Sequence, residues 1–386
     1  MATFERSTTE VTQFLQALTV QDLVDALATP RPIVAVAESA RVEDLLSLLR
    51  EHAIQACPVY RGTPACPTYT GIVSVLNLLA LLVSEVPGSK SPKLVTSEDQ
   101  RQQWMSFLRR PVTDALALNR PDQVLPEFRS SDSVIRLLRT FALGGTYRAL
   151  VHTPRDTILI SQSDLVRYLW RHHVQFPTLM DLTMPQVLTK VNPQVAAVPS
   201  PSAVELPATT VPVPAPRRDL DAKIPSKQSV ALQEPGRSST LRTVALNTPV
   251  LHAFWLMYHA HVSALAVVDS LMRSPRSDDS AGSLSETLVT GPLSTELSAS
   301  HLRLLFARDW ALLDKPIIPF LLTTVGEVPT PFVIRRRFTL SQCVAGLLTT
   351  ASRRAWFVAD ADDAPLAVFT MTDVLRTFNH ALIVDG

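Results

Sequence analysis

The chain has 386 residues, of which 46% are hydrophobic and 18% are charged, so it can bury more than one hydrophobic core and we expect two or three domains. The formal net charge of +1 provides no strong field that would draw nucleic acid or an anionic membrane surface. The three cysteines (Cys57, Cys66, Cys343) are an odd number without C-x-x-C spacing, which argues against a disulfide framework and a zinc site and favours a reducing compartment.

The first predicted unit begins with a strand-like run, PIVAV (32–36), followed by an amphipathic helix. Two more strand-like runs, ACPVY and YTGIVS, come next, and the second leads into another apolar helix. The predicted order is therefore β-α-β-β-α. The apolar residues of the first helix fall at i, i+3, i+4 and i+7, namely Val42, Leu45, Leu46 and Leu49.

The same order recurs three times farther along the chain. Strand-like runs at 123–128, 241–246 and 331–335 each precede a helix with the same apolar spacing, and two strand-like runs and another helix follow each. The unit is thus present four times. The apolar positions of the later helices are Val134, Leu137, Leu138 and Phe141, then Val250, Ala253, Phe254 and Met257, then Leu340, Cys343, Val344 and Leu347.

A polar pair stands at the entry into the last helix of every unit. Its first member is a hydroxyl residue, and its second, three positions later, is Asn, Asp, His and Asp in turn. In one interpretation this is a capping box, in which the two side chains bind backbone N–H groups that lack a partner in the helix. In the other, the pair binds the hydroxyls of a ligand beside a helix N-terminus that attracts phosphate. The pairs are Ser74/Asn77, Ser161/Asp164, Ser298/His301 and Thr370/Asp373.

The segments between the units differ in composition. Residues 192–239 are rich in Pro, Ala and Ser, and we expect a disordered linker there between two pairs of repeats. Bridging helices are predicted at 104–110 and 310–322, and Pro316 interrupts the second. The predicted domains are an N-terminal tail (1–17), repeats at 18–86, 112–173, 240–307 and 328–382, a polar insertion at 271–290 within the third repeat, and the linker.

Several signals of other protein classes are missing from the sequence. The start, MATFERSTTE, lacks the apolar region of a secretory signal, and the most apolar stretch, 71–83, is too short to span a bilayer. No glycine-rich phosphate loop occurs, and no His or Cys cluster has the spacing of a metal site or a nucleophile. We therefore predict no catalytic residues and no metal, and a location in the cytoplasm or the nucleus.

The repeated unit, with its small apolar last strand and [Ser/Thr]-x-x-[Asp/Asn], resembles the cystathionine-β-synthase (CBS) domain. Four units in one chain, with YRALV, LSASHLR and RRAWFVAD followed by FTMTDVLR, resemble the gamma subunits of AMP-activated protein kinase, and above all the plant gamma-like subunits of the sucrose-non-fermenting-related kinase. The resemblance covers about residues 18–382 apart from 192–239 and 271–290. It implies an α/β (α+β) fold in which the repeats form two paired modules arranged as a flat disc.

The resemblance also implies that clefts between paired repeats bind an adenine nucleotide (AMP, ADP or ATP), with no further cofactor. A carboxylate has enough acceptor sites for both hydroxyls of a ribose, whereas Asn77 offers one acceptor oxygen and His301 at most one acceptor nitrogen. The predicted ribose-binding residues are therefore Ser161 with Asp164 and Thr370 with Asp373, and poorer sites are formed by Ser74 with Asn77 and by Ser298 with His301.

Basic residues at the start of the second strand would, by the same resemblance, reach the phosphates. Arg148 and Arg354 occupy this place in units two and four, with Arg353 alongside, whereas units one and three have Ala56 and Ala264. Arginine suits phosphate because its planar fork donates two parallel hydrogen bonds. The alternative is that these arginines are solvated strand ends.

The leading functional hypothesis is a noncatalytic regulatory subunit that senses adenine nucleotides. The resemblance implies that it assembles with a protein kinase catalytic subunit and a scaffolding beta subunit. The alternative is a CBS scaffold that no longer binds nucleotide and acts through its surface. An enzyme is not expected, because the repeats and linkers occupy nearly the whole chain, and neither nucleic acid nor a membrane is expected as a partner.

Overall fold

The computed structural model describes residues 2–27, 32–84, 97–118, 125–191, 241–269 and 289–383. These residues contain four three-stranded sheets, in each of which the middle strand pairs in parallel with the first strand and antiparallel with the third. The predicted class, four β-α-β-β-α repeats, is confirmed. The predicted linker at 192–239 and residues 271–288 of the predicted insertion lie outside the described residues.

The elements of the repeats follow one another in the predicted order. Repeat one contains β1 (Val36–Ala37), α3 (Val42–Glu51), β2 (Ala56–Thr63), β3 (Cys66–Ser74) and α4 (Val75–Ser84). Repeat two contains β4 (Glu127–Arg129), α7 (Val134–Leu143), β5 (Arg148–His152), β6 (Thr157–Ser161) and α8 (Gln162–Arg171). Repeat three contains β7 (Thr243–Ala245), α11 (Val250–His259), β8 (Ala264–Val268), β9 (Leu293–Ser298) and η5 (Ala299–Leu304). Repeat four contains β10 (Val333–Ile334), α13 (Leu340–Thr349), β11 (Arg354–Val358), β12 (Pro365–Thr370) and α14 (Met371–Ile383).

The last helix of repeat three differs from the prediction. Instead of an α-helix, η5 is a six-residue 3-10 helix that ends where Leu305 takes an extended backbone conformation. The predicted bridging helix at 104–110 is the end of a longer one, α5 (Ser97–Arg109). The stretch 310–322 divides into η6 (Ala307–Asp314), a 3-10 helix, and α12 (Ile317–Thr324), because Pro316 lies at the N-cap of α12.

Each repeat is completed by a short helix from another part of the chain. Helix α2 (Val20–Asp25) is attached to repeat two, because the N–H of Val20 donates to the carbonyl of Asp132 at 2.8 Å and the N–H of Val134 donates to that of Leu18 at 3.1 Å. Equivalent pairs of backbone bonds attach α6 (Val112–Ala117) to repeat one, α12 to repeat three and α10 (Met184–Val191) to repeat four. The order along the chain therefore differs from the order in space.

The predicted N-terminal tail, residues 1–17, is largely helical. Helix α1 (Ala2–Gln16) contacts α14, α7 and the four-residue helix α9 (Pro177–Met180), which follows the short 3-10 helix η2 (His173–Gln175). The side chains of Val11 and Leu15 are fully buried. This segment is therefore part of the folded core.

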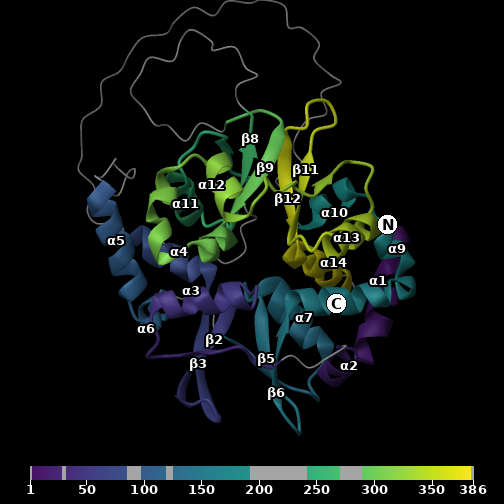
Figure 1. Ribbon diagram of the computed structural model, residues 1–386. Coiled ribbons are helices and arrows are strands. Elements are labelled where there is room, and N and C mark those ends of the chain that lie inside the picture. The colour runs from purple at the N-terminus through teal and green to yellow at the C-terminus, as the bar shows by residue number, and fades with distance from the viewer. Residues whose placement is uncertain are drawn as a thin grey trace, which may run out of the picture.

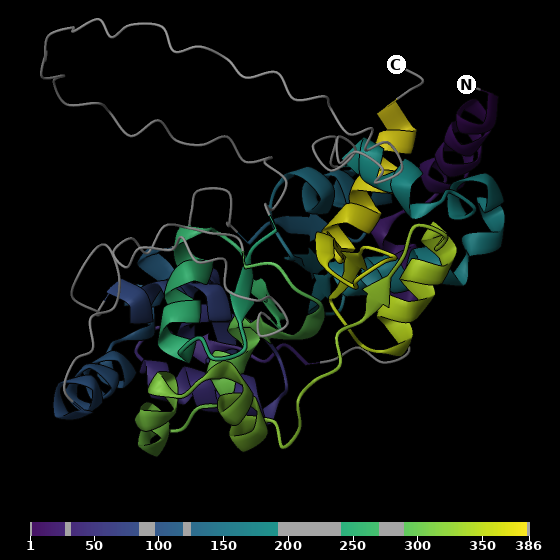
Figure 2. The same cartoon turned by 90° about the horizontal axis from the view of Figure 1, so that it is seen from above.

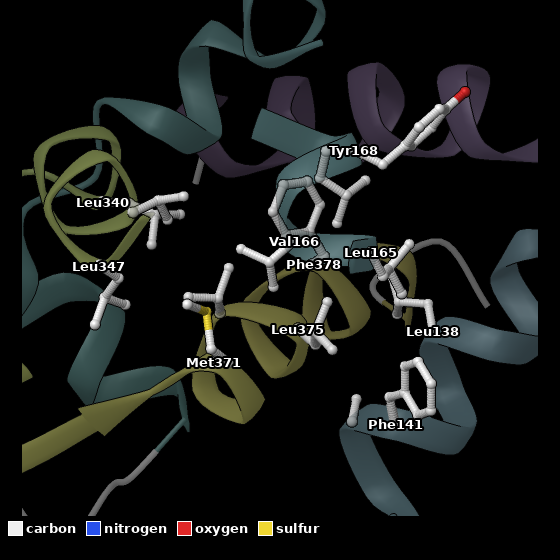
Figure 3. Packing of buried hydrophobic residues seen from close by; sticks show 14 of the residues in the cluster. Leu138, Phe141, Leu165, Val166, Tyr168, Leu340, Leu347, Met371, Leu375 and Phe378 are labelled. Carbon is white, nitrogen blue, oxygen red and sulfur yellow. The ribbon is translucent and has the colours of Figure 1, made fainter. Parts of the chain in front are cut away.

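Two large hydrophobic cores join repeats that are not neighbours in the sequence. One core combines the helices of repeats two and four with α1, and the other combines those of repeats one and three with α5. Figure 2 shows this division, with purple, blue and green helices in one half and teal and yellow helices, together with α1, in the other. In the first core Leu138 and Leu165 of repeat two lie near Leu375 and Phe378 of repeat four (Figure 3).

The sheets lie at the outside of the molecule. Sheets of consecutive repeats lie together, whereas the helices pack between repeats that are not consecutive. Figure 1 shows the sheets of repeats one and two at one end of the molecule and those of repeats three and four at the other. Side chains of β8 and β11, such as Ala266 and Trp356, form a third, small core between the sheets of repeats three and four. The sheets are thus grouped by neighbouring repeats, one with two and three with four.

Candidate functional site

The four polar pairs found in the sequence are all helix caps. In repeat two, one carboxylate oxygen of Asp164 accepts from the Ser161 N–H at 2.9 Å and from its hydroxyl at 2.6 Å, and the Asp164 N–H faces the same hydroxyl at 3.4 Å. Thr370 and Asp373 in repeat four repeat this geometry at 2.9 and 2.7 Å. The capping interpretation is therefore correct for the local structure.

Capping leaves part of the Asp164 carboxylate available. Both bonds from Ser161 end on Oδ2, while Oδ1 faces only the Nη1 of Arg167 at 3.3 Å, and 23% of the side chain is exposed. Asp373 also pairs with an arginine, Arg376, at 3.3 Å, but only 14% of its side chain is exposed. Burial raises the pKa of the Asp373 carboxyl, against the opposing effects of Thr370 and Arg376. Of the two acids, Asp164 is the more accessible to a ligand.

The other two pairs use neutral side chains. The amide oxygen of Asn77 accepts from the Ser74 N–H at 2.9 Å and from its hydroxyl at 2.7 Å, as the carboxylates do. In repeat three the Ser298 N–H lies 3.2 Å from Nδ1 of His301. Burial, together with the charges of Arg354 and Arg303, lowers the pKa of His301 to about 4, so the imidazole is neutral at pH 7 and can accept this bond.

A cleft of about 970 Å³ opens between repeats one and two beside Asp164. Its volume lies in the range of small-molecule binding sites. Its apolar lining comes from α2, from the segment 32–34 and Ile54 of repeat one, and from Ile158 and Leu159 of repeat two. Its polar lining includes Ser161, Ser163 and Asp164 of repeat two. The residues that the sequence analysis did not single out are Leu23, Ala26, Leu27, Pro32, Ile33, Val34, His52, Ala53, Ile54, Ile158, Leu159, Ser163, Arg167, Tyr168 and Arg171.

Two of the three predicted phosphate-binding arginines line this cleft. Arg148 comes from repeat two and Arg353 from repeat four. Among the described residues, neither guanidinium forms an ion pair or a side-chain hydrogen bond. Burial lowers the pKa of Arg148, and the surrounding protein and the charges of Arg148, Arg303 and Arg354 lower that of Arg353 to about 10. Both guanidinium groups are cationic at pH 7, and the nearby Asp164 carboxylate acts in the opposite direction to burial on the pKa of Arg148.

The sequence register of these arginines is confirmed by the strand pairing. Arg148 is paired with Ser161, and Arg354 is paired with Thr370, the hydroxyl residue of its own motif. Ala56 and Ala264 hold the same place opposite Ser74 and Ser298. The side chains at this place differ in length and charge, so the four repeats are not chemically equivalent.

Arg354 has a different environment from its counterpart in repeat two. Its Nη1 lies 3.2 Å from Oε1 of Glu296, its Nη2 lies 3.3 Å from the hydroxyl of Ser263, and 9% of the residue is exposed. The indole N–H of Trp356 donates to Oε2 of the same glutamate at 2.7 Å. Together with the small core around Trp356, these contacts join repeats three and four.

The hydroxyl residues of all four motifs meet in a small central recess of about 180 Å³. It is lined by Ser74, Ser161, Ser298 and Thr370 together with the three predicted arginines, Arg148, Arg353 and Arg354. Arg148 and Arg353 line both this recess and the cleft of repeats one and two. A ligand in the cleft with its anionic end directed inward would therefore reach both guanidinium groups.

The remaining features concern metal ligands, membrane-spanning helices and the cysteines. No group of three or more His, Cys, Asp or Glu side chains in them is arranged to hold a metal ion, and no helix there is long and apolar enough to cross a membrane. All three cysteines are free, and burial raises the pKa of Cys57 to about 12. The Cys57 thiol is therefore protonated at pH 7.

Comparison with known proteins gives structural matches alone: no family model and no curated protein matches the chain. A protein of Methanocaldococcus jannaschii, described as a proposed archaeal homolog of the AMP-activated protein kinase gamma subunit, aligns with a TM-score of 0.57 and 12% identity over 94% of this chain and 100% of that one. The fold is that of CBS-domain proteins. A conserved protein of Pyrococcus horikoshii aligns with a TM-score of 0.45 and 11% identity over 94% of this chain and all of that one. The CBS domain of a Sphaerobacter thermophilus membrane protein aligns with a TM-score of 0.29 and 17% identity over 41% of this chain and 91% of that one.

At these identities the likeness shows the fold alone. The specific resemblance to plant gamma-like subunits receives no support from these matches. The nucleotide-binding role of the predicted residues stays a prediction, which rests on the geometry of the cleft.

Proposed function

We propose that the chain is a noncatalytic regulatory protein that binds an adenine nucleotide in the cleft between repeats one and two. The observation that carries the proposal is the combination of groups in this cleft. An accessible carboxylate oxygen of Asp164, the guanidinium groups of Arg148 and Arg353, and an apolar lining are brought together by three repeats and α2.

Each group suits one part of a nucleotide. The carboxylate can accept hydrogen bonds from the ribose hydroxyls, and the two arginines can donate to phosphate oxygens on the side of the central recess. The apolar lining around Ile33, Val34 and Ile54 can cover a flat, weakly polar base. Because Ile33, Val34 and Ile54 are aliphatic, they would select a base by shape and not by side-chain hydrogen bonds.

The role in a kinase complex is the finer part of this proposal. It is supported by the fold-level likeness to a protein described as a proposed archaeal homolog of a kinase gamma subunit and by the presence of four repeats in one chain. We propose a protein kinase catalytic subunit and a scaffolding beta subunit as partners. Size-exclusion chromatography of the three chains together, with kinase activity measured with and without AMP, tests this part separately.

The second candidate is a CBS scaffold that binds no nucleotide. The interface of repeats three and four, where Glu296 already binds Arg354 and Trp356, favours it. Isothermal titration calorimetry with AMP, ADP and ATP separates the two candidates. Saturable binding supports the regulatory proposal, and the absence of heat for all three nucleotides, together with no copurified nucleotide by absorbance at 260 nm, supports the scaffold.

A further inference from the structure

One position on the last strand of each repeat differs sharply in chemistry between repeats. This position lies two residues before the hydroxyl residue of the motif. Its partner on the neighbouring strand lies two residues after the place held by Ala56, Arg148, Ala264 or Arg354. Three repeats have an aliphatic residue there and repeat three has an acid. The four residues are Ile72, Leu159, Glu296 and Val368, and their cross-strand partners are Pro58, Leu150, Ala266 and Trp356.

Glu296 uses both carboxylate oxygens to bind repeat four. Oε1 takes the ion pair with Arg354 at 3.2 Å, and Oε2 accepts from the Trp356 indole at 2.7 Å. The hydroxyl of Ser263 completes the contacts of the Arg354 guanidinium. A planar carboxylate held by an arginine and further donors is the arrangement by which proteins also bind a phosphate.

The same place between repeats one and two holds no acid. Arg148 corresponds to Arg354 by register, and Ile72 corresponds to Glu296, so the position equivalent to the acid is aliphatic. Both Arg148 and Arg354 line the central recess, but Arg148 also lines the cleft of repeats one and two. Arg354 is already bound to a carboxylate by an ion pair, whereas Arg148 forms no ion pair among the described residues.

We propose that Glu296 acts as an internal anionic ligand of Arg354, which closes the interface of repeats three and four and confines nucleotide to the cleft of repeats one and two. The nucleotide part of this inference rests on the proposed function. The other part of the inference, that a phosphate-sized anion can bind beside Arg354 once Glu296 is replaced, is independent of the proposed function. The expected stoichiometry is one nucleotide per chain.

The first experiment removes the internal anion with Glu296→Gln, which keeps an acceptor oxygen for Trp356. Isothermal titration calorimetry with inorganic phosphate is expected to show one more bound phosphate per chain in Glu296→Gln than in the wild type. The double variant Glu296→Gln with Arg354→Gln, the matched control, is expected to lose the additional site. Because a ligand of the native state stabilises it by mass action, phosphate should also raise the melting temperature of Glu296→Gln more than that of the wild type. Identical phosphate titrations for wild type and Glu296→Gln would overturn the inference.

The second experiment places the same acid in the open cleft. Ile72→Glu is expected to supply Arg148 with a carboxylate and to weaken AMP binding by about tenfold or more, since AMP must then compete with a covalently attached anion. Ile72→Gln, which has the same shape without the charge, is expected to bind AMP within about threefold of the wild type. Equal AMP affinities for Ile72→Glu and Ile72→Gln would overturn the inference.

The two failures can be told apart. If the wild type binds no nucleotide, the proposed function fails, and the phosphate titration of Glu296→Gln still decides whether Glu296 masks an anion position. If the wild type binds two nucleotides per chain, the proposed function stands and the closing role of Glu296 is wrong.

Discussion

The substitution Asp164→Asn separates the capping role of this residue from its proposed role in binding a nucleotide. The reason is that an asparagine, Asn77, already forms the same cap in repeat one. In repeat one Asn77 accepts the same two bonds from Ser74, at 2.9 and 2.7 Å, that Asp164 accepts from Ser161 at 2.9 and 2.6 Å. The cap should therefore survive in Asp164→Asn. The lost interaction is the half-exposed pair with Arg167 at 3.3 Å, and pairs of this kind stabilise a helix by roughly 0.3–0.5 kcal/mol.

The effect on the ligand should be larger. Hydrogen bonds to a charged group contribute roughly 1.5–3 kcal/mol, so loss of the carboxylate should weaken AMP binding by about ten- to a hundredfold. Urea denaturation of the apo protein and calorimetric titration with AMP measure the two effects independently. Asp373→Asn is the matched control, since this residue has the same cap but does not line the cleft, and its AMP affinity should stay at the wild-type value.

The reasoning would be refuted by an Asp164→Asn protein that binds AMP as tightly as the wild type. Asp164→Ala adds a further check. It removes the cap as well, so it should cost about 1 kcal/mol of stability beyond Asp164→Asn. Equal stabilities of the Asn and Ala variants would show that the cap contributes little.

Three other predictions concern the arginines, the buried histidine and the core. Arg148→Ala or Arg353→Ala should lower the affinity for AMP about ten- to a hundredfold and that for adenosine hardly at all, and a constant ratio of the two affinities would exclude phosphate contacts. The pKa of His301 is about 4 in the folded protein and about 6.5 in the unfolded chain. Burial of the neutral imidazole therefore leaves the free energy of unfolding unchanged above pH 6.5 and lowers it as the pH falls toward 4, by up to about 3 kcal/mol. Denaturation at pH 7, 5.5 and 4.5 should show a smaller loss in His301→Gln, and parallel losses would contradict the assignment. Phe378→Ala, which removes a fully buried ring 5.1 Å from that of Phe176, should cost about 3–5 kcal/mol in the free energy of unfolding, whereas a cost below about 1 kcal/mol would show that this core collapses around the cavity.

The repeats were predictable because local patterns determine them. The helices beginning at Val42, Val134, Val250 and Leu340 bury the apolar stripe that the 3.6-residue period predicts. Arg148 pairs with Ser161, and its place was predicted because the start of the second strand holds the same position relative to the [Ser/Thr]-x-x-[Asp/Asn] motif in the repeats. Spacing along the chain is thus sufficient where both partners belong to the same repeat.

The N-terminal helix was within reach of the same method. Val11, Phe14, Leu15 and Leu18 have the i, i+3, i+4, i+7 spacing, and all four pack in the core of repeats two and four. The segment precedes the first repeat, so the repeat comparison gave it no counterpart. The sequence analysis therefore assigned residues 1–17 to a tail.

The difference between the two clefts could not be predicted from spacing. Glu296 is separated from Arg354 by 58 positions and from Trp356 by 60, and the sequence alone does not place one strand of repeat three against one strand of repeat four. The cleft itself depends on α2, which belongs to repeat two in space although it precedes repeat one in the chain. Such contacts arise from the packing of whole repeats and have no local signal.

The pairing of distant repeats in each core has a consequence for synthesis on the ribosome. Among the described residues, repeat one shares its large core with repeat three and with α5, whose Trp104 indole donates to the carbonyl of Phe306, 202 positions later, and repeat two shares its large core with repeat four and α1. The N-terminal half therefore emerges with the apolar faces of α4 and α7 uncovered. The core of repeats one and three needs the chain as far as Leu321, and the core of repeats two and four needs it as far as Ala381. Contacts of such sequence separation slow folding and leave apolar surface open to aggregation meanwhile. The apolar surface that α12 and α14 cover in the folded protein therefore stays exposed on the nascent chain until these helices have left the exit tunnel.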